Sequence, residues 1–199
     1  MKPSDVEFLL TASRLKRLHR VGWLMSVGAD ESVASHMWGT ALAALLLVNE
    51  SEHAHDVNIA RVLLMAILHD LPEAILSDIP HDRIPADLKT RLEKQVFTEL
   101  VARLDQQGQL SEAWRELTEG RTVEARTVLA ADVIDMVVQA LFFERAGVRP
   151  EALHEFFTSG LARVRKTGIQ AAIDLFELLY QEHMNRHQPS SQVPDEQES

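Results

Sequence analysis

The sequence contains no cysteine among its 199 residues. Disulfide bonds and thiolate metal sites are therefore excluded, and any metal ion must be bound by His, Asp, Glu or water. The absence of cysteine is typical of proteins from a reducing compartment. The first eight residues also lack the apolar core of a signal peptide. From these absences we expect a cytoplasmic protein.

Glycine and proline are scarce, with 8 and 7 residues, so long segments run without a residue that breaks helices. The length suits one well-packed domain. We therefore expect an all-α fold in which residues 1–186 form a single helical bundle. Residues 187–199 are polar and contain two prolines, and we expect this tail to be disordered.

Long apolar runs are also missing. The longest, residues 41–48, is too short to cross a bilayer, and we expect no membrane partner. The net charge of −10 argues against a nucleic-acid polymer as partner, because polymer binding depends on neutralising phosphates. Segment 14–20 is an exception, with four Lys or Arg in seven residues. It is either a helix end whose cations interact with the helix dipole, or a patch that binds phosphate.

Hydrophobic spacing predicts a series of helices. The first starts at a capping-box pattern formed by Ser4 and Glu7, and residues 22–30, with Trp23, are expected to form a loop. Asn58 is expected to cap a central apolar helix over 59–68. The other helices are expected from Asp30 or Ser32 to about residue 50, and over 86–105, 111–117, 123–145, 150–166 and 169–184.

The most informative segment is 63–78, whose apolar helix ends in His69 and Asp70. Pro72 should kink or end the helix there, since it lacks an N–H and crowds the preceding turn. A buried carboxylate is costly unless it is paired or bound to a cation, and imidazole with carboxylate suits a divalent transition metal. The two residues are therefore either metal ligands or a satisfied polar pair at a helix end.

Further candidates lie on two other helices. His36 is alone on an apolar helix, where a histidine is more often packed or exposed than a ligand. Asp132 and Asp135 both interrupt the apolar pattern of the 123–145 helix, and a carboxylate there requires a cation or several hydrogen-bond donors. Their spacing does not show which of the two points inward.

Four sequence blocks together resemble the HD-domain metal phosphohydrolases, and among them the small 5'-deoxynucleotidases of the YfbR and HD-domain-containing protein 2 group. The blocks are LKRLHRVGW (15–23), ESVASHM (31–37), HDLPEAILSDIP (69–80) and ADVIDMVVQA (131–140). The resemblance implies an HD-domain helical bundle with four metal ligands, His36, His69, Asp70 and Asp132. It thereby selects Asp132 over Asp135.

The resemblance also implies catalytic and substrate-binding roles. Glu73 matches the carboxylate that handles the proton of the water or leaving group, and Asp78 matches an acidic residue near the sugar and the chemistry. Arg20 matches a phosphate-binding arginine, and Trp23 is expected to wall the base or sugar pocket. The sequence departs from the family pattern at Pro72 and at Ser35. Family members often have an acidic residue at the position of Ser35, and if that carboxylate orients the first ligand, metal binding is weaker here.

The implied activity is hydrolysis of 2'-deoxyribonucleoside 5'-monophosphates, small nucleotide substrates, to deoxynucleoside and phosphate by a homodimer. The implied cofactor is a divalent metal cation, and the ligands accept Co, Mn, Zn, Fe or Ni. The alternatives are an HD hydrolase acting on deoxynucleoside triphosphates or another phosphate ester, a non-catalytic scaffold that binds metal or nucleotide, and a two-iron oxygenase. A triphosphate needs more cations, for which only Arg83 and Lys89 are candidates outside 14–20. An oxygenase needs further His or Asp ligands near the site, which we cannot assign from the sequence.

Overall fold

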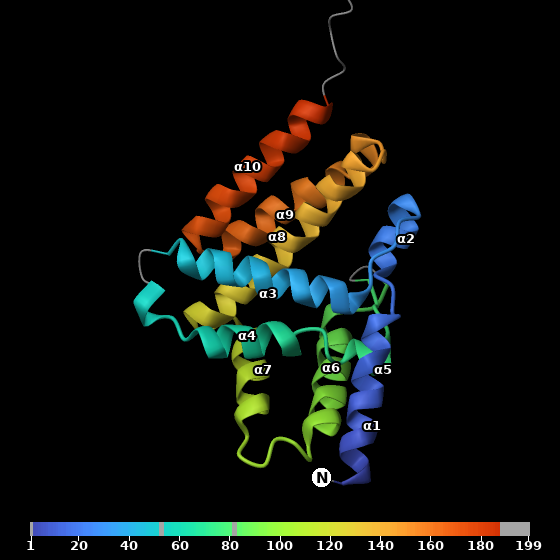
Figure 1. Ribbon diagram of the computed structural model, residues 1–199, viewed down its shortest axis with the longest axis vertical. Coiled ribbons are helices and arrows are strands. Elements are labelled where there is room, and N and C mark those ends of the chain that lie inside the picture. Colours follow the sequence, from blue (N-terminus) through green and yellow to red (C-terminus); the bar gives the residue numbers. More distant parts are fainter. Residues whose placement is uncertain (1, 52–53, 81–82, 188–199) are drawn as a thin grey trace, which may run out of the picture.

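The structure is a computed structural model that describes residues 2–51, 54–80 and 83–187. In these residues the regular elements are helices (Figure 1). The described residues also contain one isolated β-bridge, between His19 and Ser32. The predicted all-α class is therefore confirmed. None of the helices described is long and apolar enough to cross a membrane. The predicted disordered tail lies outside the described residues, except for His187, which ends the last helix.

The α-helices have the following bounds in chain order: α1 (Pro3–Ala12), α2 (Val21–Val27), α3 (Val33–Asn49), α4 (Ile59–Leu68), α5 (Glu73–Leu76), α6 (Ala86–Val101), α7 (Gln109–Glu119), α8 (Val123–Arg145), α9 (His154–Thr167) and α10 (Gln170–His187). Short 3₁₀ turns cover Ser13–Lys16, Ala54–Asp56 and Pro150–Ala152.

Helix α8 is the centre of the fold. It packs against α3, α4, α7, α9 and α10, and Figure 1 shows α3 and α4 crossing it. Its buried side chains point in several directions around the helix and include Val128, Val133, Ile134, Val137 and Phe143. Each fully buried side chain of this kind stabilises the fold by roughly 1.5–3 kcal/mol. Because α8 is buried on most sides, the carboxylates that it carries also lie in the interior of the protein.

Side-chain caps mark the starts of α3 and α4: Ser32, one of the two predicted starts, caps α3, and Asn58 caps α4 as predicted. The Ser32 side chain accepts a hydrogen bond from the backbone N–H of Ser35 at the start of α3, at 3.1 Å. The Asn58 side chain accepts one from Arg61 N–H at the start of α4, at 3.0 Å. Gly120, with a φ of 61°, ends α7 in the left-handed region, as its position in the sequence indicates.

The capping box at Ser4 and Glu7 was a wrong prediction. Helix α1 already begins at Pro3, and the backbone N–H of Lys2 donates to Asp5 Oδ2 at 2.6 Å. Ser4 is therefore inside the helix, where its hydroxyl is buried without a partner. Proline favours this earlier start, since its fixed φ suits the first helical position.

The predicted loop over 22–30 is also wrong in its first part, because residues 21–27 form α2. The short helix is held by tertiary contacts: the indole of Trp23 packs against Phe156 and Phe143, with ring centroids 4.3 and 5.3 Å apart. Gly28, with a φ of 66°, ends the helix. Seven residues are too few for hydrophobic periodicity to reveal a helix.

The end of α4 agrees with the prediction from Pro72. The helix stops at Leu68, and His69 and Asp70 lie in the tight turn between α4 and α5. Backbone hydrogen bonds from Leu71 N–H to Leu68 O at 3.1 Å and from Glu73 N–H to Asp70 O at 3.0 Å keep this turn coiled. Both polar side chains are thus placed at the end of a buried helix, beside α3 and α8.

Candidate metal centre

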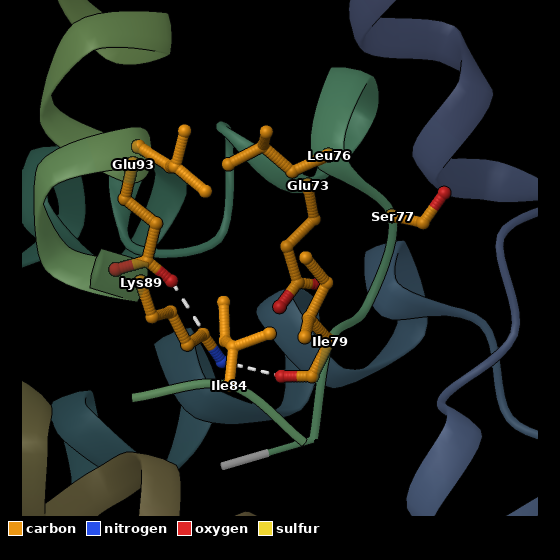
Figure 2. Close-up of a pocket in the computed structure, with 8 residues that line it drawn as sticks. Glu73, Leu76, Ser77, Ile79, Ile84, Lys89 and Glu93 are labelled. Carbon is orange, nitrogen blue, oxygen red and sulfur yellow. Dashed lines mark hydrogen bonds and ion pairs between the residues drawn. The ribbon is translucent and has the colours of Figure 1, made fainter. Parts of the chain in front are cut away.

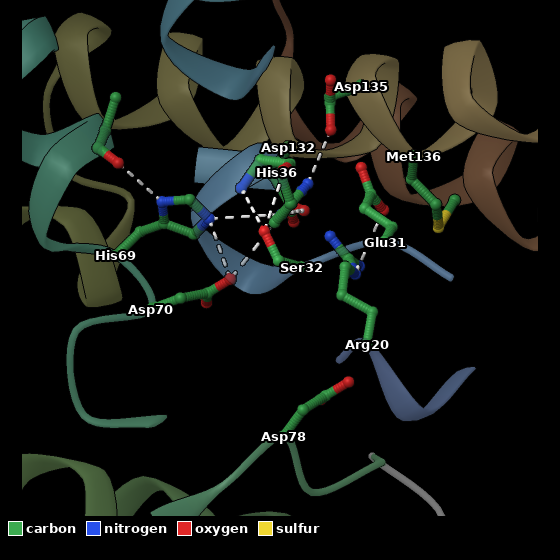
Figure 3. Close-up of polar contacts among 12 residues, drawn as sticks. Arg20, Glu31, Ser32, His36, His69, Asp70, Asp78, Asp132, Asp135 and Met136 are labelled. Carbon is green, nitrogen blue, oxygen red and sulfur yellow. Dashed lines mark hydrogen bonds and ion pairs between the residues drawn. The ribbon is translucent and has the colours of Figure 1, made fainter. Parts of the chain in front are cut away.

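Four side chains from α3, α8 and the turn after α4 come together, as Figure 3 shows. His36 Nε2 lies 3.2 Å from Asp132 Oδ1 and 3.7 Å from Asp70 Oδ2. His69 Nε2 lies 3.1 Å from Asp70 Oδ2 and 3.3 Å from His36 Nε2. Single ligand atoms of His36, His69 and Asp70 all lie within 4.8 Å of one another, so these three residues could hold a metal ion. Asp132 faces the same point from α8.

The hydrogen bonds of the two imidazole rings show that this donor set fits a cation. His69 Nδ1 lies 2.8 Å from the carbonyl oxygen of Ala66, which only accepts, so this nitrogen carries the proton. His36 Nδ1 lies 2.7 Å from Asp135 Oδ2 and donates in the same way. In the neutral rings, two Nε2 lone pairs then face each other and two carboxylates. Such a set repels itself unless a metal ion or extra protons lie between its members.

The pKa values of these groups reflect the same close approach of imidazole nitrogens and carboxylates. Burial and the charge of Arg20 lower the pKa of His36, but hydrogen bonds to Asp132 and Asp135 outweigh both and raise it to about 9. Burial alone would raise the pKa of Asp132, whereas the hydrogen bond with His36 and the charge of Arg163 hold it well below its ordinary value. A metal ion held here would replace the proton on Nε2 of His36, so metal affinity should fall as the solution becomes more acidic.

Both carboxylates of α8 point inward, which the spacing in the sequence left open. Asp132 faces Nε2 of His36, and Asp135 binds Nδ1 of the same ring (Figure 3). Asp135 therefore gives His36 the carboxylate partner that the sequence does not provide at position 35. The hydroxyl of Ser35 instead lies 2.8 Å from that of Ser32, at the cap of α3.

Arg20 is the member of the basic segment 14–20 that reaches the centre. Its Nε lies 3.9 Å from Glu31 Oε2, and its Nη1 is buried without a hydrogen-bond partner. Burial opposes the charge of Arg20, yet the carboxylates of Asp132, Asp70 and Glu31 raise its pKa overall. The other three cations of the segment are exposed. An unpartnered guanidinium N–H among carboxylates is a donor available to an anion.

A short backbone ladder holds Arg20 at this position. Its N–H donates to the carbonyl of Glu31 at 2.9 Å, and Val33 N–H donates to the carbonyl of Leu18 at 2.8 Å. These bonds join the two ends of the segment that contains α2. Arg20 is thereby fixed beside the first turn of α3, which carries His36.

Asp78 lies in the segment after α5 and faces Arg20 in Figure 3. Its Oδ2 accepts a hydrogen bond from the backbone N–H of Val21 at 2.6 Å. The carboxylate thus satisfies a free N–H at the start of α2, next to Arg20. Its predicted place near the chemistry stays a prediction, and its observed contact is to the backbone beside the arginine.

Glu73 lies in the first turn of α5 and lines a small cavity with Ile79, Ile84, Lys89 and Glu93 (Figure 2). Burial, followed by the charges of Asp70 and Asp78, raises the pKa of Glu73 to about 10. The carboxyl group therefore holds its proton at neutral pH, close enough to the centre to sense the charge of Asp70.

Trp23 does not wall an open pocket, which corrects the sequence-based expectation. Its side chain is 1% exposed, because the ring is buried between α8 and α9. The indole Nε1–H donates to Glu31 Oε2 at 2.7 Å. Trp23 thus orients the carboxylate beside Arg20 and has no exposed surface for a substrate.

Arg163 on α9 is a residue that sequence reasoning missed. Its Nη2 donates to Asp132 Oδ2 at 2.8 Å, and its side chain is 42% exposed. No motif marks it, since arginines also occupy positions 165 and 149 nearby and nothing in the spacing distinguishes one from another. Its contact with Asp132 depends on the packing of α9 against α8.

Comparison with known proteins agrees with this arrangement. The family model described as HD domain matches residues 12–174 of the chain. The chain belongs to the HD-domain family. Its relatives include the 5'-deoxynucleotidase HDDC2 of Bos taurus, which is 34% identical over 158 residues, covering 77% of this chain and 75% of the relative. The family that the four sequence blocks predicted is therefore confirmed.

Solved structures of similar chains extend the comparison. The PH0347 protein of Pyrococcus horikoshii OT3 has a TM-score of 0.77 and 31% identity, covering 88% of this chain and 98% of that one. A predicted metal-dependent phosphohydrolase of Magnetospirillum magnetotacticum MS-1 has a TM-score of 0.64 and 25% identity, and the match covers 92% of each chain. Together with the family match, these relatives assign the chain to the HD-domain phosphohydrolases.

The charges of the HD-domain centre predict a pH dependence of stability. In the metal-free protein we expect the free energy of unfolding to fall as the pH rises from 6.5 toward 9. The pKa of His36 is raised from 6.5 to about 9, so its stabilising contribution is complete below 6.5 and is lost above 9. Glu73, with a pKa of about 10, acts in the same direction because the folded state also retains its proton.

This dependence can be measured by urea unfolding in the presence of a chelator at several pH values. The variant Glu73→Gln serves as the control, because it retains the His36 contribution and removes that of Glu73. A free energy of unfolding that stays constant or rises across this range would contradict the assignment of these two protons.

Proposed function

We propose that this HD-domain protein is a metal-dependent 5'-deoxynucleotidase, which hydrolyses 2'-deoxyribonucleoside 5'-monophosphates to deoxynucleoside and phosphate. The observation that supports this most is the buried, unpartnered Nη1 of Arg20 beside the four residues of ligand type. An anion that approaches the centre would find this donor already desolvated. The names of the relatives, 5'-deoxynucleotidase HDDC2 among them, support the choice of substrate.

In this proposal the metal is held by His36, His69, Asp70 and Asp132. A bound divalent cation would supply Lewis-acid chemistry at the phosphoryl group. Nitrogen and oxygen ligands of this kind accept Mn, Co, Fe, Ni or Zn, so the metal present depends on availability. The homodimer and the cytoplasmic location stay predictions.

The remaining residues bind the phosphate and move the proton. Arg20 donates to the phosphoryl oxygens, and Asp78 holds the backbone of Val21 so that the arginine keeps its place. The oxygen of water forms the new bond to phosphorus while the bond from phosphorus to the 5'-oxygen breaks. Glu73, protonated at neutral pH, gives its proton to that leaving oxygen and regains one from the attacking water.

Phosphate release from matched nucleotides tests this function. The protein would be stripped of metal, reloaded with Co, Mn or Zn, and given deoxynucleoside monophosphates, the matching ribonucleotides and deoxynucleoside triphosphates. Metal-dependent release of phosphate from the deoxynucleoside monophosphates alone is expected. Release of triphosphate or pyrophosphate from the triphosphates would replace the proposal with the second candidate, and no release at all would leave a non-catalytic scaffold.

Arg163 is the observation that favours the second candidate, a hydrolase of deoxynucleoside triphosphates. A longer phosphate chain needs more cations, and Arg163 lies at the centre with part of its side chain exposed. The two residues considered from the sequence are less available. Lys89 Nζ donates to the carbonyl of Ile79 at 2.7 Å and lies 3.7 Å from Glu93, and Arg83 contacts the sulfur of Met25.

Substitution of Arg163 distinguishes these roles. A hydrogen bond to a charged group contributes about 1.5–3 kcal/mol, so Arg163→Met should lower kcat/KM by roughly 10–100-fold if the guanidinium binds phosphate. A larger loss with triphosphates than with monophosphates would indicate contact with the outer phosphates. Arg165→Met is the matched control, because Arg165 is exposed and paired with Glu177. Equal kcat/KM values for the two variants would exclude a substrate role for Arg163.

A further inference from the structure

A glycine in the interior of α3 faces the carboxylate of Asp135. Gly39 lies seven positions into a helix of 17 residues, where glycine is unfavourable relative to alanine. A Cβ atom at Gly39 would lie 1.8 Å from Asp135 Oδ1 and 2.7 Å from its Cγ. No side chain of any size fits at position 39 while Asp135 keeps its place. Glycine is therefore needed at this position of α3, because the Asp135 carboxylate from α8 occupies the space that a side chain would fill.

The same carboxylate binds the ring of His36. Gly39 follows His36 by three residues, so the two positions lie on one face of α3. Oδ1 of Asp135 occupies the space where a Cβ of residue 39 would lie. Oδ2 of the same carboxylate lies 2.7 Å from His36 Nδ1, a contact drawn in Figure 3. His36 is 1% exposed and Asp135 13%. The hydrogen bond between His36 and Asp135 thus joins two side chains that are largely shielded from water.

We propose that Gly39 and Asp135 together position His36 as a metal ligand. Gly39 supplies the space, and Asp135 keeps the proton on Nδ1 so that the lone pair of Nε2 points toward Asp70 and Asp132. This inference rests on the metal centre of the proposed function. A carboxylate bound to the outer nitrogen of a ligating histidine fixes its tautomer and orientation, and the loss of such a partner lowers metal affinity about 10–100-fold.

The two histidines of the centre are fixed by different acceptors. His69 donates to the backbone carbonyl of Ala66, which belongs to α4 itself and needs no space from another helix. His36 depends on a side chain from α8, and that side chain depends on the missing Cβ at position 39. The pair Gly39 and Asp135 also explains how the centre retains a carboxylate partner with serine at position 35.

Metal affinity is the first test. We expect Asp135→Ala and Gly39→Ala each to weaken the binding of Co²⁺ by about 10–100-fold, measured by titration of the metal-free protein. Asp135→Asn should lie between these variants and the unchanged protein, because its amide oxygen still accepts from Nδ1. Gly160→Ala is the control: its Cβ would lie 3.0 Å from the Phe176 ring and 3.3 Å from Met136, so it disturbs helix packing, and its three nearest neighbouring atoms belong to none of the four candidate ligands.

The metal-free protein provides a second test with no dependence on activity. In the otherwise unchanged protein, Gly39→Ala should lower the melting temperature, because the new methyl group collides with Asp135. In the Asp135→Ala background the obstructing atoms are gone, and the same substitution should leave the melting temperature unchanged or raise it through better helix propensity. Gly160→Ala should lower the melting temperature equally in both backgrounds.

The outcomes separate this inference from the proposed function. If the unchanged protein binds Co²⁺ and Asp135→Ala binds it as tightly, the positioning role is overturned and the metal centre stands. If the unchanged protein binds no divalent metal, both fail. If Gly39→Ala lowers the melting temperature as much without Asp135 as with it, Gly39 serves another contact and the proposed pair is overturned.

Discussion

Replacement of Asp70 by alanine is expected to abolish metal binding and phosphate release together. Oδ2 of Asp70 lies 3.1 Å from His69 Nε2 and 3.7 Å from His36 Nε2, so it is the carboxylate shared by both imidazoles. Burial alone would raise the pKa of Asp70, but the charges of His69, His36 and Arg20 hold it far below its ordinary value. The carboxylate is therefore ionised across the physiological range and available to a cation.

Without this carboxylate the charges around the centre are less favourable to a metal ion. Asp132 would be left with Arg163 as a partner, and Arg20 would lose one of the carboxylates that offset its charge. The loss of affinity should exceed the roughly 10–100-fold typical of an outer partner, since a ligand itself is removed. The measurement is metal content after reloading, together with phosphate release.

Two further variants guard against misreading this result. Asp70→Asn keeps the shape of the side chain and should also lose the metal, while circular dichroism checks that the fold is retained. Asp87→Ala removes an exposed carboxylate of α6 that pairs with Arg91, and it should keep both metal and activity. Phosphate release by Asp70→Ala after metal stripping would exclude the metal-dependent mechanism.

Glu73→Gln is expected to retain the metal and lose turnover by about 100–10,000-fold, the range of general acid–base catalysis. Glutamine keeps the size and the hydrogen-bonding capacity of the protonated carboxyl group. It cannot release a proton to the leaving oxygen, so the effect should appear in kcat while Co²⁺ affinity stays near that of the unchanged protein.

Glu93→Gln is the matched control for this prediction. Glu93 lines the same cavity from α6 and lies 3.7 Å from Lys89 Nζ (Figure 2). Burial raises its pKa as well, and the control makes the same chemical substitution in the same cavity. Of the two glutamates, only Glu73 follows the candidate ligand Asp70 within one helical turn. Normal turnover by Glu73→Gln, or an equal loss in both variants, would remove Glu73 from the catalytic step.

The parts of the fold that were predicted from sequence are those with a strong local cause. The break after Leu68 follows from Pro72, and the starts of α3 and α4 follow from Ser32 and Asn58, each a local hydrogen bond. Helix α2 was missed because its stability comes from the packing of Trp23 and from the Asp78 carboxylate, 57 residues away.

The same distinction applies to the site. His69 and Asp70 were recognisable because adjacent polar residues at the end of an apolar helix are unusual. The inward position of both Asp132 and Asp135 could not be read from spacing, since α8 is buried on several sides and offers more than one interior direction. Arg163 and Gly39 had no signal of their own, because each acquires its role only where two helices touch.

The backbone ladder at Leu18, Arg20, Glu31 and Val33 has a consequence for variation in this part of the chain. The ladder joins the two ends of the segment that contains α2. The hydrogen bonds of the ladder, and not the length of that segment, therefore fix the distance from Arg20 to the first turn of α3. Insertions or deletions at Gly28, where α2 ends, should change the local surface and leave the arginine in register, whereas Asp30 lies next to the ladder and pairs with His19. Evolution and protein engineering can therefore lengthen or shorten the segment between Arg20 and Glu31 without moving these two residues relative to each other.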